Sequence, residues 1–367
     1  MNTYRERVDF FWKWFQANEE KIHDFIENPK KYDPEQTTAF VGNALDLVFS
    51  KSSYFEFGGS HEFSFTTAGE HYLFYLLPYL VSRAPVDLKY EWTFSPYKMG
   101  GISKTYGYRK EDAVISIENI LLRVGYDEKQ NVFYVGFYHE EFAKMEEKAA
   151  LNMFFVLLDA LVGENVVEMY IGPIERLTKK TGKMFPMYEL GPYIEKKLEE
   201  NKRTFFRSPS DSYSAYEMDP AEEEGLRQDL YAGTTCCIEL VEEFYQNKRD
   251  MFDDFEKSGA KACFLYYNCA NDDPELMLQL REEILDKISE FVLGEKDSGN
   301  EIGILLGTGF GKENAYIDLL LYDEEIFLQE VKPLLRQYDY DFYLADFREG
   351  GPVKNLTENK GAASYIN

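Results

Sequence analysis

The stretch HEEFAKMEEKAALNMFFVLLDALVGENVVEMYIGPIER, which runs from His139 to Arg176, decides the fold class. Apolar residues recur through its first part at steps of three and four positions, at Phe142, Met145, Ala149, Met153, Val156 and Ala160. This spacing places them along one side of an α-helix, so the stretch predicts a helix with one buried face.

The second half of this helix carries a single polar residue. Between Met153 and Val162 only Asp159 is polar, so we expect this part of the helix to be enclosed on all sides. Gly163 provides a flexible stop, and residues 166–171 are predicted to form a strand that leaves it. A buried helix that leads directly into a strand is typical of the centre of an α+β layer.

The composition is that of a folded globular protein. The chain has 367 residues, of which 44% are hydrophobic and 16% aromatic, with 29 Phe and 28 Tyr, and these values argue against disorder. The length suits two domains or one large domain. The formal net charge of −26 disfavours nucleic acid and anionic membrane surfaces as partners. It suits a basic partner, or it serves solubility alone.

The acidic residues concentrate in the second half of the chain. Residues 1–180 contain 27 acids and 20 bases, whereas residues 181–367 contain 39 acids and 20 bases, so the net charges are −7 and −19. This step indicates a domain boundary near residue 180. We therefore predict a two-domain α+β protein in which each domain has a mixed or antiparallel sheet with helices packed mainly on one face. The predicted parts are an N-terminal domain over 1–180, a connecting region over 181–233, a C-terminal domain over 234–350 and a loose tail over 351–367.

Helix and strand signals alternate in the first half. The first predicted helix covers residues 4–28, and its apolar stripe is expected to dock into a core. The stripe consists of Val8, Phe11, Phe15, Ile22 and Phe25. Asp33 and Pro34 predict the start of a second helix to about residue 51.

The rest of the first half is predicted to contain short strands around one further helix. Gly58-Gly59 predicts a hairpin between two aromatic strands, and a capping box over residues 67–70 predicts a helix that ends near residue 82. Further strands are predicted over residues 89–94, 113–124 and 132–138.

The second half alternates more regularly. Its strands are predicted over residues 235–240, 262–267, 302–306, 315–322 and 341–346. Helices are predicted between them, the clearest beginning after the capping residues Asp273 and Asp323. This β-α-β-α-β-β-α-β order favours an antiparallel or mixed sheet.

Several short motifs occur in a fixed order in the first half: FWKWF at 11–15, FEFGG at 55–59, RAP at 83–85, and LLDALVGE followed by YIGPIE between 157 and 175. In these motifs residues 8–180 resemble a group of uncharacterised bacterial proteins that contain a domain of unknown function. The resemblance implies a shared fold family and a bacterial source, and it implies no activity. The group has an Arg-rich segment after the Trp-containing strand, where this chain has FSPYK at 94–98.

Familiar catalytic and metal-binding motifs are missing from the sequence. The glycine-rich residues 307–312 lack the spacing and the following helix of a phosphate-binding loop, so we interpret them as a turn between strands. The histidines, at positions 23, 61, 71 and 139, show no ligand spacing, and no G-x-S-x-G elbow is present. We therefore expect no metal and no cofactor. A site whose ligands come from distant segments of the chain is still an open alternative.

The cysteines and the start of the chain indicate a cellular setting. All four cysteines, at positions 236, 237, 263 and 269, lack metal or redox spacing and are predicted to be buried, reduced thiols. The first ten residues are polar and charged and do not resemble a signal peptide. We expect a cytoplasmic protein.

Three carboxylates form the first candidate site, namely Asp159, Glu164 and Glu168. A carboxylate in an apolar helical turn is either hydrogen-bonded as a structural lock or raised in pKa for function. For Asp159 we favour the structural lock. Glu164 and Glu168 follow closely enough to line the same end of the sheet.

A basic, aromatic loop over residues 97–110 forms the second candidate site. Its candidate binding residues are Lys98, Lys104, Tyr106, Arg109 and Lys110. Loops of this length are often functional. This one is suited to bind an anionic ligand, or to neutralise an acidic surface of the second domain.

These observations favour binding over catalysis. We predict a non-catalytic binding or protective interaction module whose partner is a basic protein. The alternative is a metal-assisted hydrolase that uses the carboxylate cluster at Asp159. The identity of the partner and the oligomeric state are open at this point.

Overall fold

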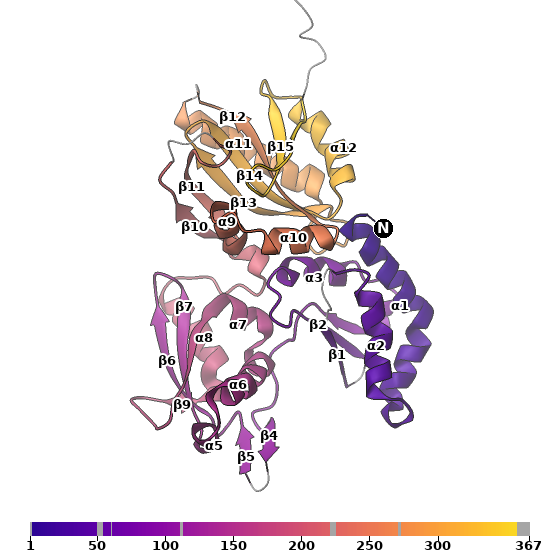
Figure 1. The fold of residues 1–367 in the computed structure, drawn as a ribbon, viewed down its shortest axis with the longest axis vertical. Helices are drawn as coiled ribbons and strands as arrows, with labels where there is room; N and C mark the ends of the chain where they lie inside the picture. Colours follow the sequence, from indigo (N-terminus) through magenta and orange to yellow (C-terminus); the bar gives the residue numbers. More distant parts are fainter. Residues whose placement is uncertain are drawn as a thin grey trace, which may run out of the picture. The chain divides into compact units, whose positions relative to one another are not determined.

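The chain folds into helices and several β-sheets, which confirms the predicted α+β class (Figure 1). The computed structural model describes residues 2–49, 54–59, 61–110, 113–220, 225–270 and 273–357. Within these residues no helix is both long enough and apolar enough to cross a membrane.

The chain divides into two compact units, and each is assembled from separate segments. The larger unit comprises Met1–Tyr54, Ala68–Trp92 and Ser212–Asn367. The smaller unit comprises Phe55–Thr67 and Thr93–Asp211.

This division differs from the boundary predicted near residue 180. The predicted N-terminal domain is shared between both units, because its first helices belong with the C-terminal segments. The predicted connecting region is shared as well. Its helix α8 (Leu190–Glu200) buries Leu190, Ile194 and Leu198 in the core of the smaller unit, while its last residues belong to the larger unit. A step in charge density reports composition, whereas a domain is defined by contacts between distant segments.

A seven-stranded antiparallel sheet forms the centre of the larger unit. Its strand order is β10-β11-β13-β14-β12-β15-β16. The strands are β10 (Ser214–Glu217), β11 (Leu230–Thr235), β12 (Lys261–Asn268), β13 (Gly303–Gly311), β14 (Asn314–Leu321), β15 (Phe342–Asp346) and β16 (Val353–Asn355). The prediction of a turn at the glycine-rich residues 307–312 is wrong for most of them, because residues 307–311 are the end of strand β13 and the turn into β14 lies at residues 312–313.

Helices contact both faces of this sheet. Successive side chains of a strand point to opposite faces. Cys263 and Leu265 of β12 share a core cluster with helices α11 (Pro274–Ile288) and α12 (Glu324–Leu335). On the other face, Phe264 packs against Phe244 of α9 (Ile238–Tyr245), with ring centroids 6.3 Å apart. The sequence had predicted helices mainly on one face. Apolar residues at successive positions of β12 are the sign of a strand covered on both sides.

The helices of the larger unit come from both ends of the chain. They are α1 (Tyr4–Glu27), α2 (Pro34–Leu45), α3 (Leu73–Ser82), α4 (Leu88–Glu91), α9 (Ile238–Tyr245), α10 (Asp250–Lys257), α11 (Pro274–Ile288) and α12 (Glu324–Leu335). Two short elements accompany them, a 3₁₀ turn η1 (Pro29–Lys31) after α1 and a π-helical turn η4 (Ser289–Leu293) after α11. As predicted, Asp33, Asp273 and Asp323 cap the starts of α2, α11 and α12.

The first helix docks its stripe into the core as predicted. Every residue of the stripe is buried. The hydroxyl of Tyr4 donates to the carbonyl of Leu76 at 2.8 Å, and the indole of Trp12 donates to the carbonyl of Leu80, also at 2.8 Å. Both acceptors lie in α3, so these bonds fix α1 against α3.

Hydrogen bonds also join α1 to the C-terminal segment of the larger unit. The backbone N–H of Tyr4 donates to the carbonyl of Gly259 at 2.8 Å. The guanidinium of Arg7 donates to the carbonyl of Lys257 at 2.6 Å, across 250 positions of sequence. The larger unit is therefore completed by residues from opposite ends of the chain.

Arg227 and Asp318 form a buried ion pair in the larger unit. The two side chains are 0% and 1% exposed, and Nη1 of Arg227 lies 2.5 Å from Oδ1 of Asp318. Nη2 of Arg227 donates to the hydroxyl of Tyr216 at 3.0 Å, and the rings of Phe264 and Phe347 lie 5.2 and 4.5 Å from its guanidinium carbon. Such burial is tolerated because each charge has a partner.

The beginning of the predicted loose tail is part of the sheet. β16 pairs with β15, and Leu356 is 3% exposed. The hydroxyl of Thr357 accepts a hydrogen bond from the N–H of Phe342 at 2.8 Å. The prediction is wrong for these residues, and the last ten residues of the predicted tail lie outside the described part of the chain.

The described residues of the smaller unit form three small sheets and four helices. The sheets have the orders β1-β2-β3, β4-β5 and β8-β7-β6-β9. The strands are β1 (Tyr54–Gly58), β2 (Glu62–Thr66), β3 (Thr93–Ser95), β4 (Gly107–Lys110), β5 (Ala113–Ser116), β6 (Leu121–Asp127), β7 (Val132–Tyr138), β8 (Ile171–Arg176) and β9 (Phe185–Pro186). The helices are α5 (Glu140–Lys144), α6 (Glu147–Val162), α7 (Glu164–Tyr170) and α8, with 3₁₀ turns η2 (Met187–Glu189) and η3 (Pro209–Asp211).

The stretch from His139 to Arg176 crosses from β7 to β8, which pair in parallel. Its helix is interrupted between α5 and α6, and residues 166–170 continue as helix α7 where a strand was predicted. The predicted complete enclosure of α6 is also wrong, because Phe155 and Val156 are 41% and 45% exposed. Apolar residues on every side of a helix do not by themselves establish how many neighbours cover it.

Two further boundaries differ from the predictions. α3 begins at Leu73 rather than directly after the predicted capping box, because Ala68 and Gly69 take positive φ values of 48° and 86°. The predicted strand over residues 89–94 is divided between helix α4 and strand β3. The one over residues 113–124 is divided between β5 and β6.

Candidate functional site

A short extended segment places Lys98 beside the junction of α6 and α7. The N–H of Gly101 donates to the carbonyl of Leu161 at 2.9 Å, and the N–H of Glu164 donates to the carbonyl of Lys98 at 3.1 Å. A Cβ atom at Gly100 would lie 2.4 Å from the backbone of the last residue of α6. Only glycine permits this close approach. The basic loop and the carboxylate cluster, predicted as separate sites, therefore meet at Lys98.

Glu164 is the structural carboxylate of this junction. Its side chain is buried, and it accepts hydrogen bonds from the hydroxyl of Thr66, from the N–H of Thr67 at 3.4 Å and from the N–H of Lys98 at 3.1 Å. These donors come from the end of β2 and from the extended segment. A buried carboxylate is stable where several donors satisfy its oxygens. Glu164 thus joins α7 to the end of β2 and to the extended segment that contains Lys98.

Lys98 is surrounded by carboxylates. Its Nζ lies 2.7 Å from Oε1 of Glu56 in β1. Burial lowers the pKa of Lys98, but the hydrogen bond to Glu56 and the charges of Glu56, Glu164 and Asp159 outweigh it, so the pKa is raised. The ammonium group therefore stays charged and balances part of the negative charge around it.

Asp159 is the carboxylate of this group whose pKa is raised most clearly. Burial raises the pKa of Asp159 to about 7, the charges of Glu164 and Glu56 add to this shift, and Lys98 opposes it. In the described part of the chain we find no hydrogen bond to its carboxylate, so the predicted structural lock is Glu164 and not Asp159. A carboxyl group with this pKa changes its protonation near neutral pH.

The third predicted carboxylate lies apart from this group. Glu168 is exposed on α7, and its charge is not among those that shift the pKa of Asp159. Among the described residues, one group of three potential metal ligands is close enough to share an ion, and it lies in the larger unit: Glu19, His23 and Glu91. Asp159, Glu164 and Glu168 are not among the described residues that are close enough to share an ion.

Three other predicted binding residues of the basic loop are exposed. Lys104 precedes β4, and Tyr106 and Arg109 are exposed in or beside the β4–β5 hairpin. Nζ of Lys104 lies 5.8 Å from the ring centroid of Tyr188. The side chain of Lys110 lies outside the described residues. The structure thus separates Lys98, which faces Glu56, from the other predicted binding residues.

A small cavity lies beside the same segment. Its volume is about 250 Å³, and Met99, Asn165, Phe205, Arg207 and Glu195 are among the residues that line it. Arg207 contacts two neighbours. Its guanidinium carbon lies 5.3 Å from the ring centroid of Phe205, and its Nη2 lies 3.9 Å from Oε1 of Glu195. Ligand pockets of ordinary size span about 300–1,000 Å³. This cavity therefore lies just below the usual range for drug-sized ligands.

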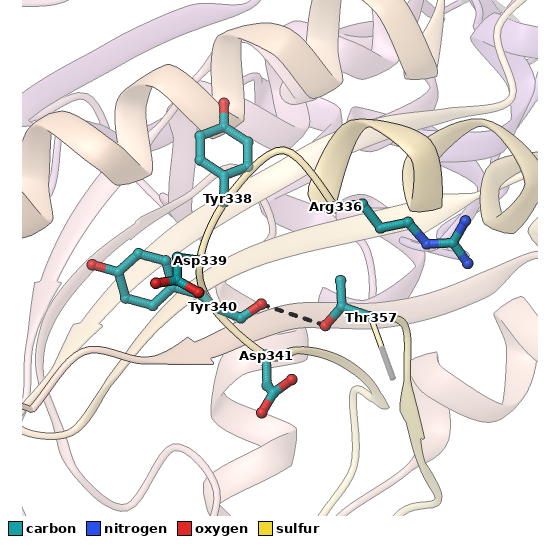
Figure 2. Close-up of a pocket in the computed structure, with 6 residues that line it drawn as sticks. All are labelled: Arg336, Tyr338, Asp339, Tyr340, Asp341 and Thr357. Carbon is teal, nitrogen blue, oxygen red and sulfur yellow. Dashed lines mark hydrogen bonds between the residues drawn. The ribbon is translucent and has the colours of Figure 1, made fainter. Parts of the chain in front are cut away.

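A second, smaller hollow follows α12 in the larger unit. Its volume is about 140 Å³, and it is lined by Arg336, Tyr338, Asp339, Tyr340, Asp341 and Thr357. Figure 2 shows that the charged and hydroxyl groups of these side chains point in different directions rather than toward one point. The hollow lacks the convergent polar groups of a binding site.

The sequence could not reveal Glu56 or Thr66 as members of the cluster. Thr66 lies 98 positions before its partner Glu164, and both Thr66 and Glu56 were predicted only as parts of a hairpin. The group at Glu19 and His23 did have a local signal. A glutamate and a histidine four positions apart on a helix share one face.

The chain was compared with protein-family models, curated proteins and solved structures, and none of the three comparisons found a match.

Proposed function

We propose that the protein is a non-catalytic binding module whose larger unit engages a basic protein. The distribution of charge between the two units is the observation that supports this proposal. The larger unit contains 46 acidic and 23 basic residues, a net charge of −23, whereas the smaller unit contains 20 and 17, a net charge of −3. Acidity needed only for solubility has no reason to be confined to one unit.

Exposed residues of α11 and of the following turn η4 form the proposed docking surface. Leu278, Glu282, Asp286 and Glu290 recur every four positions, and all four are exposed. Phe291, the next residue, is 65% exposed. An exposed aromatic ring next to a carboxylate combines an apolar anchor with a field that attracts cationic side chains.

The hydrolase alternative has weaker support. The raised pKa of Asp159 suits a general acid or base, but Glu164 is held by three hydrogen-bond donors and Glu168 lies apart. A metal-assisted reaction needs at least two or three protein ligands at one ion. Those carboxylates do not supply them at one point.

The bacterial cytoplasm is the proposed setting. The order of the aromatic motifs supports a bacterial source. The four cysteines are buried and free of disulfides, as expected for reduced thiols.

Association kinetics test the proposed function. The chain is used to capture basic proteins from a bacterial lysate, and the captured protein is then purified for rate measurements by surface plasmon resonance. We expect the association rate to fall by about tenfold or more between low and physiological ionic strength, because salt screens electrostatic steering. The dissociation rate should change less.

A pair of charge-matched variants locates the contact. Glu282, Asp286 and Glu290 are changed together to Lys in one variant. In the control, the exposed residues Glu118, Glu128 and Glu199 of the smaller unit are changed together to Lys. We expect the first variant to associate about tenfold more slowly and the control to associate nearly as fast as the unmodified chain. Equal losses in both variants, or a rate indifferent to salt, would leave the acidity as a solubility feature.

A further inference from the structure

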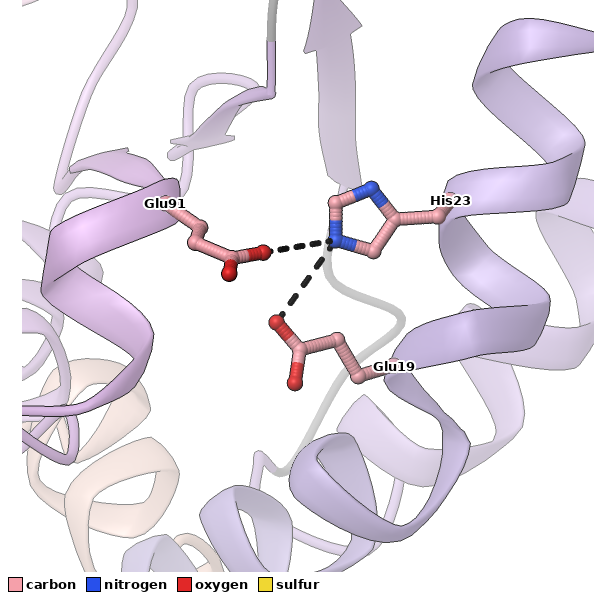
Figure 3. A group of neighbouring side chains, drawn as sticks. All are labelled: Glu19, His23 and Glu91. Atoms are coloured by element: carbon pink, nitrogen blue, oxygen red, sulfur yellow. Dashed lines mark ion pairs between the residues drawn. The ribbon is translucent and has the colours of Figure 1, made fainter.

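Three side chains from two helices of the larger unit converge near the end of α4. Glu19 and His23 lie one turn apart on α1, and Glu91 is the last residue of α4. Nε2 of His23 lies 3.6 Å from Oε1 of Glu19 and 3.7 Å from Oε2 of Glu91. Figure 3 shows both carboxylates directed at this one imidazole nitrogen.

These distances are too long for a tight ion pair. Charge-assisted hydrogen bonds between nitrogen and oxygen are about 2.7–2.9 Å long. With metal–ligand bonds of about 2.0–2.1 Å, two ligands of a tetrahedral zinc ion lie about 3.3 Å apart. The three ligand atoms all lie within 4.8 Å of one another. Their spacing is therefore closer to that of ligands around an ion than to that of hydrogen-bonded partners.

A buried tryptophan orients two of the three ligands. The indole N–H of Trp92 donates to Oε1 of Glu19 at 2.8 Å, and its ring lies 4.8 Å from the imidazole of His23. Trp92 is 3% exposed and packs edge-on against Phe15 of α1. Outer partners of this kind hold metal ligands in position before an ion binds. A carboxylate oxygen with one hydrogen bond keeps a second lone pair for a metal.

We propose that Glu19, His23 and Glu91 form a site for a divalent transition-metal ion, and that the ion is Zn²⁺. Imidazole and carboxylate are ligands that zinc accepts, whereas Mg²⁺ and Ca²⁺ prefer oxygen alone. Two carboxylates and a neutral imidazole balance the charge of the ion. Water completes a fourth position. The bound ion joins α1 to α4, and this role does not depend on the proposed protein partner.

Calorimetric titration of the full chain tests the site. The protein is first freed of metals with a chelator and then titrated with Zn²⁺, and in parallel with Mg²⁺, at physiological ionic strength. We expect one Zn²⁺ per chain and much weaker binding of Mg²⁺. The midpoint of thermal unfolding should rise with Zn²⁺ concentration, because an ion that binds only the folded state stabilises it.

Single substitutions with a matched control assign the ligands. Glu91→Gln and His23→Gln should each weaken Zn²⁺ binding by about tenfold or more. Glu91 is well exposed, with 68% side-chain exposure, so its variant should fold normally. Glu20→Gln removes the same charge from an exposed neighbour on α1 and should leave the affinity unchanged.

Three results would each overturn the proposal. The first is the absence of stoichiometric Zn²⁺ binding to the unmodified chain. The second is equal affinity in Glu91→Gln and Glu20→Gln, which would place the ion elsewhere. The third is Mg²⁺ binding as tight as Zn²⁺ binding, which would indicate general attraction of cations to an acidic surface.

Discussion

Replacement of Arg227 by methionine is expected to lower the free energy of unfolding of the larger unit by about 3–5 kcal/mol, because it leaves the buried charge of Asp318 without its partner. Burial already raises the pKa of Asp318, and the neighbouring guanidinium opposes that rise. The rings of Phe264 and Phe347 beside the pair offer no hydrogen bonds in exchange. Asp318 must then take up a proton in the folded state or be exposed to water.

Urea denaturation followed by tryptophan fluorescence measures this loss. All three tryptophans, Trp12, Trp14 and Trp92, belong to the larger unit, so their fluorescence follows the unfolding of that unit. The double variant Arg227→Met with Asp318→Leu serves as the control, because replacing a whole buried pair with apolar residues is often close to neutral. A single variant as stable as the unmodified chain, or a double variant no better than the single one, would contradict the role of the pair.

The Asp159→Asn variant is expected to gain stability over the unmodified chain as pH rises from 4 to 8. The ordinary pKa of an aspartate is 3.8, and in the folded protein that of Asp159 is about 7. Between these values the unfolded state has lost a proton that the folded state retains, so rising pH favours unfolding. Asparagine resembles the protonated form at every pH. After a discount for partial exposure, the gain above pH 7 should reach about 1–3 kcal/mol.

Far-UV circular dichroism in urea measures this effect. The smaller unit contains no tryptophan, so its unfolding changes the circular dichroism signal but is not followed by tryptophan fluorescence. Glu147→Gln removes an exposed carboxylate from the same helix and should show no such dependence on pH. A constant difference between Asp159→Asn and the unmodified chain from pH 4 to 8 would mean that Asp159 titrates normally.

Elements with strong local patterns were predictable from the sequence. α1 has an apolar stripe at helical spacing, and β12 and β14 are nearly continuous apolar runs. Asp33, Asp273 and Asp323 marked helix starts because a capping side chain acts on the backbone two or three positions ahead of it. In each case the signal and the structure that it specifies lie within a few residues of one another.

Features that depend on distant contacts could not be predicted. The segment 68–92 belongs with residues 212–367, and no property of its own sequence indicates this. α7 was predicted as a strand because its valines have high strand propensity, but tertiary contacts override such preferences. In the candidate site, the sequence identified Asp159 as unusual. Its role, however, depended on whether the hydrogen-bond donors at the end of β2 bind Asp159 or Glu164, and they bind Glu164.

The segmented larger unit has a consequence for the newly made chain. The smaller unit has all its residues once position 211 has left the ribosome, whereas α1 must wait for a partner 250 positions further along. At about 5–20 residues per second this delay is roughly 10 to 50 s. During that time Tyr4 and Arg7 lack their partners Gly259 and Lys257, whereas Trp12 and Phe15 can already contact Leu80 and Trp92. The first turn of α1 is therefore the last part of this helix to be packed as the chain is made.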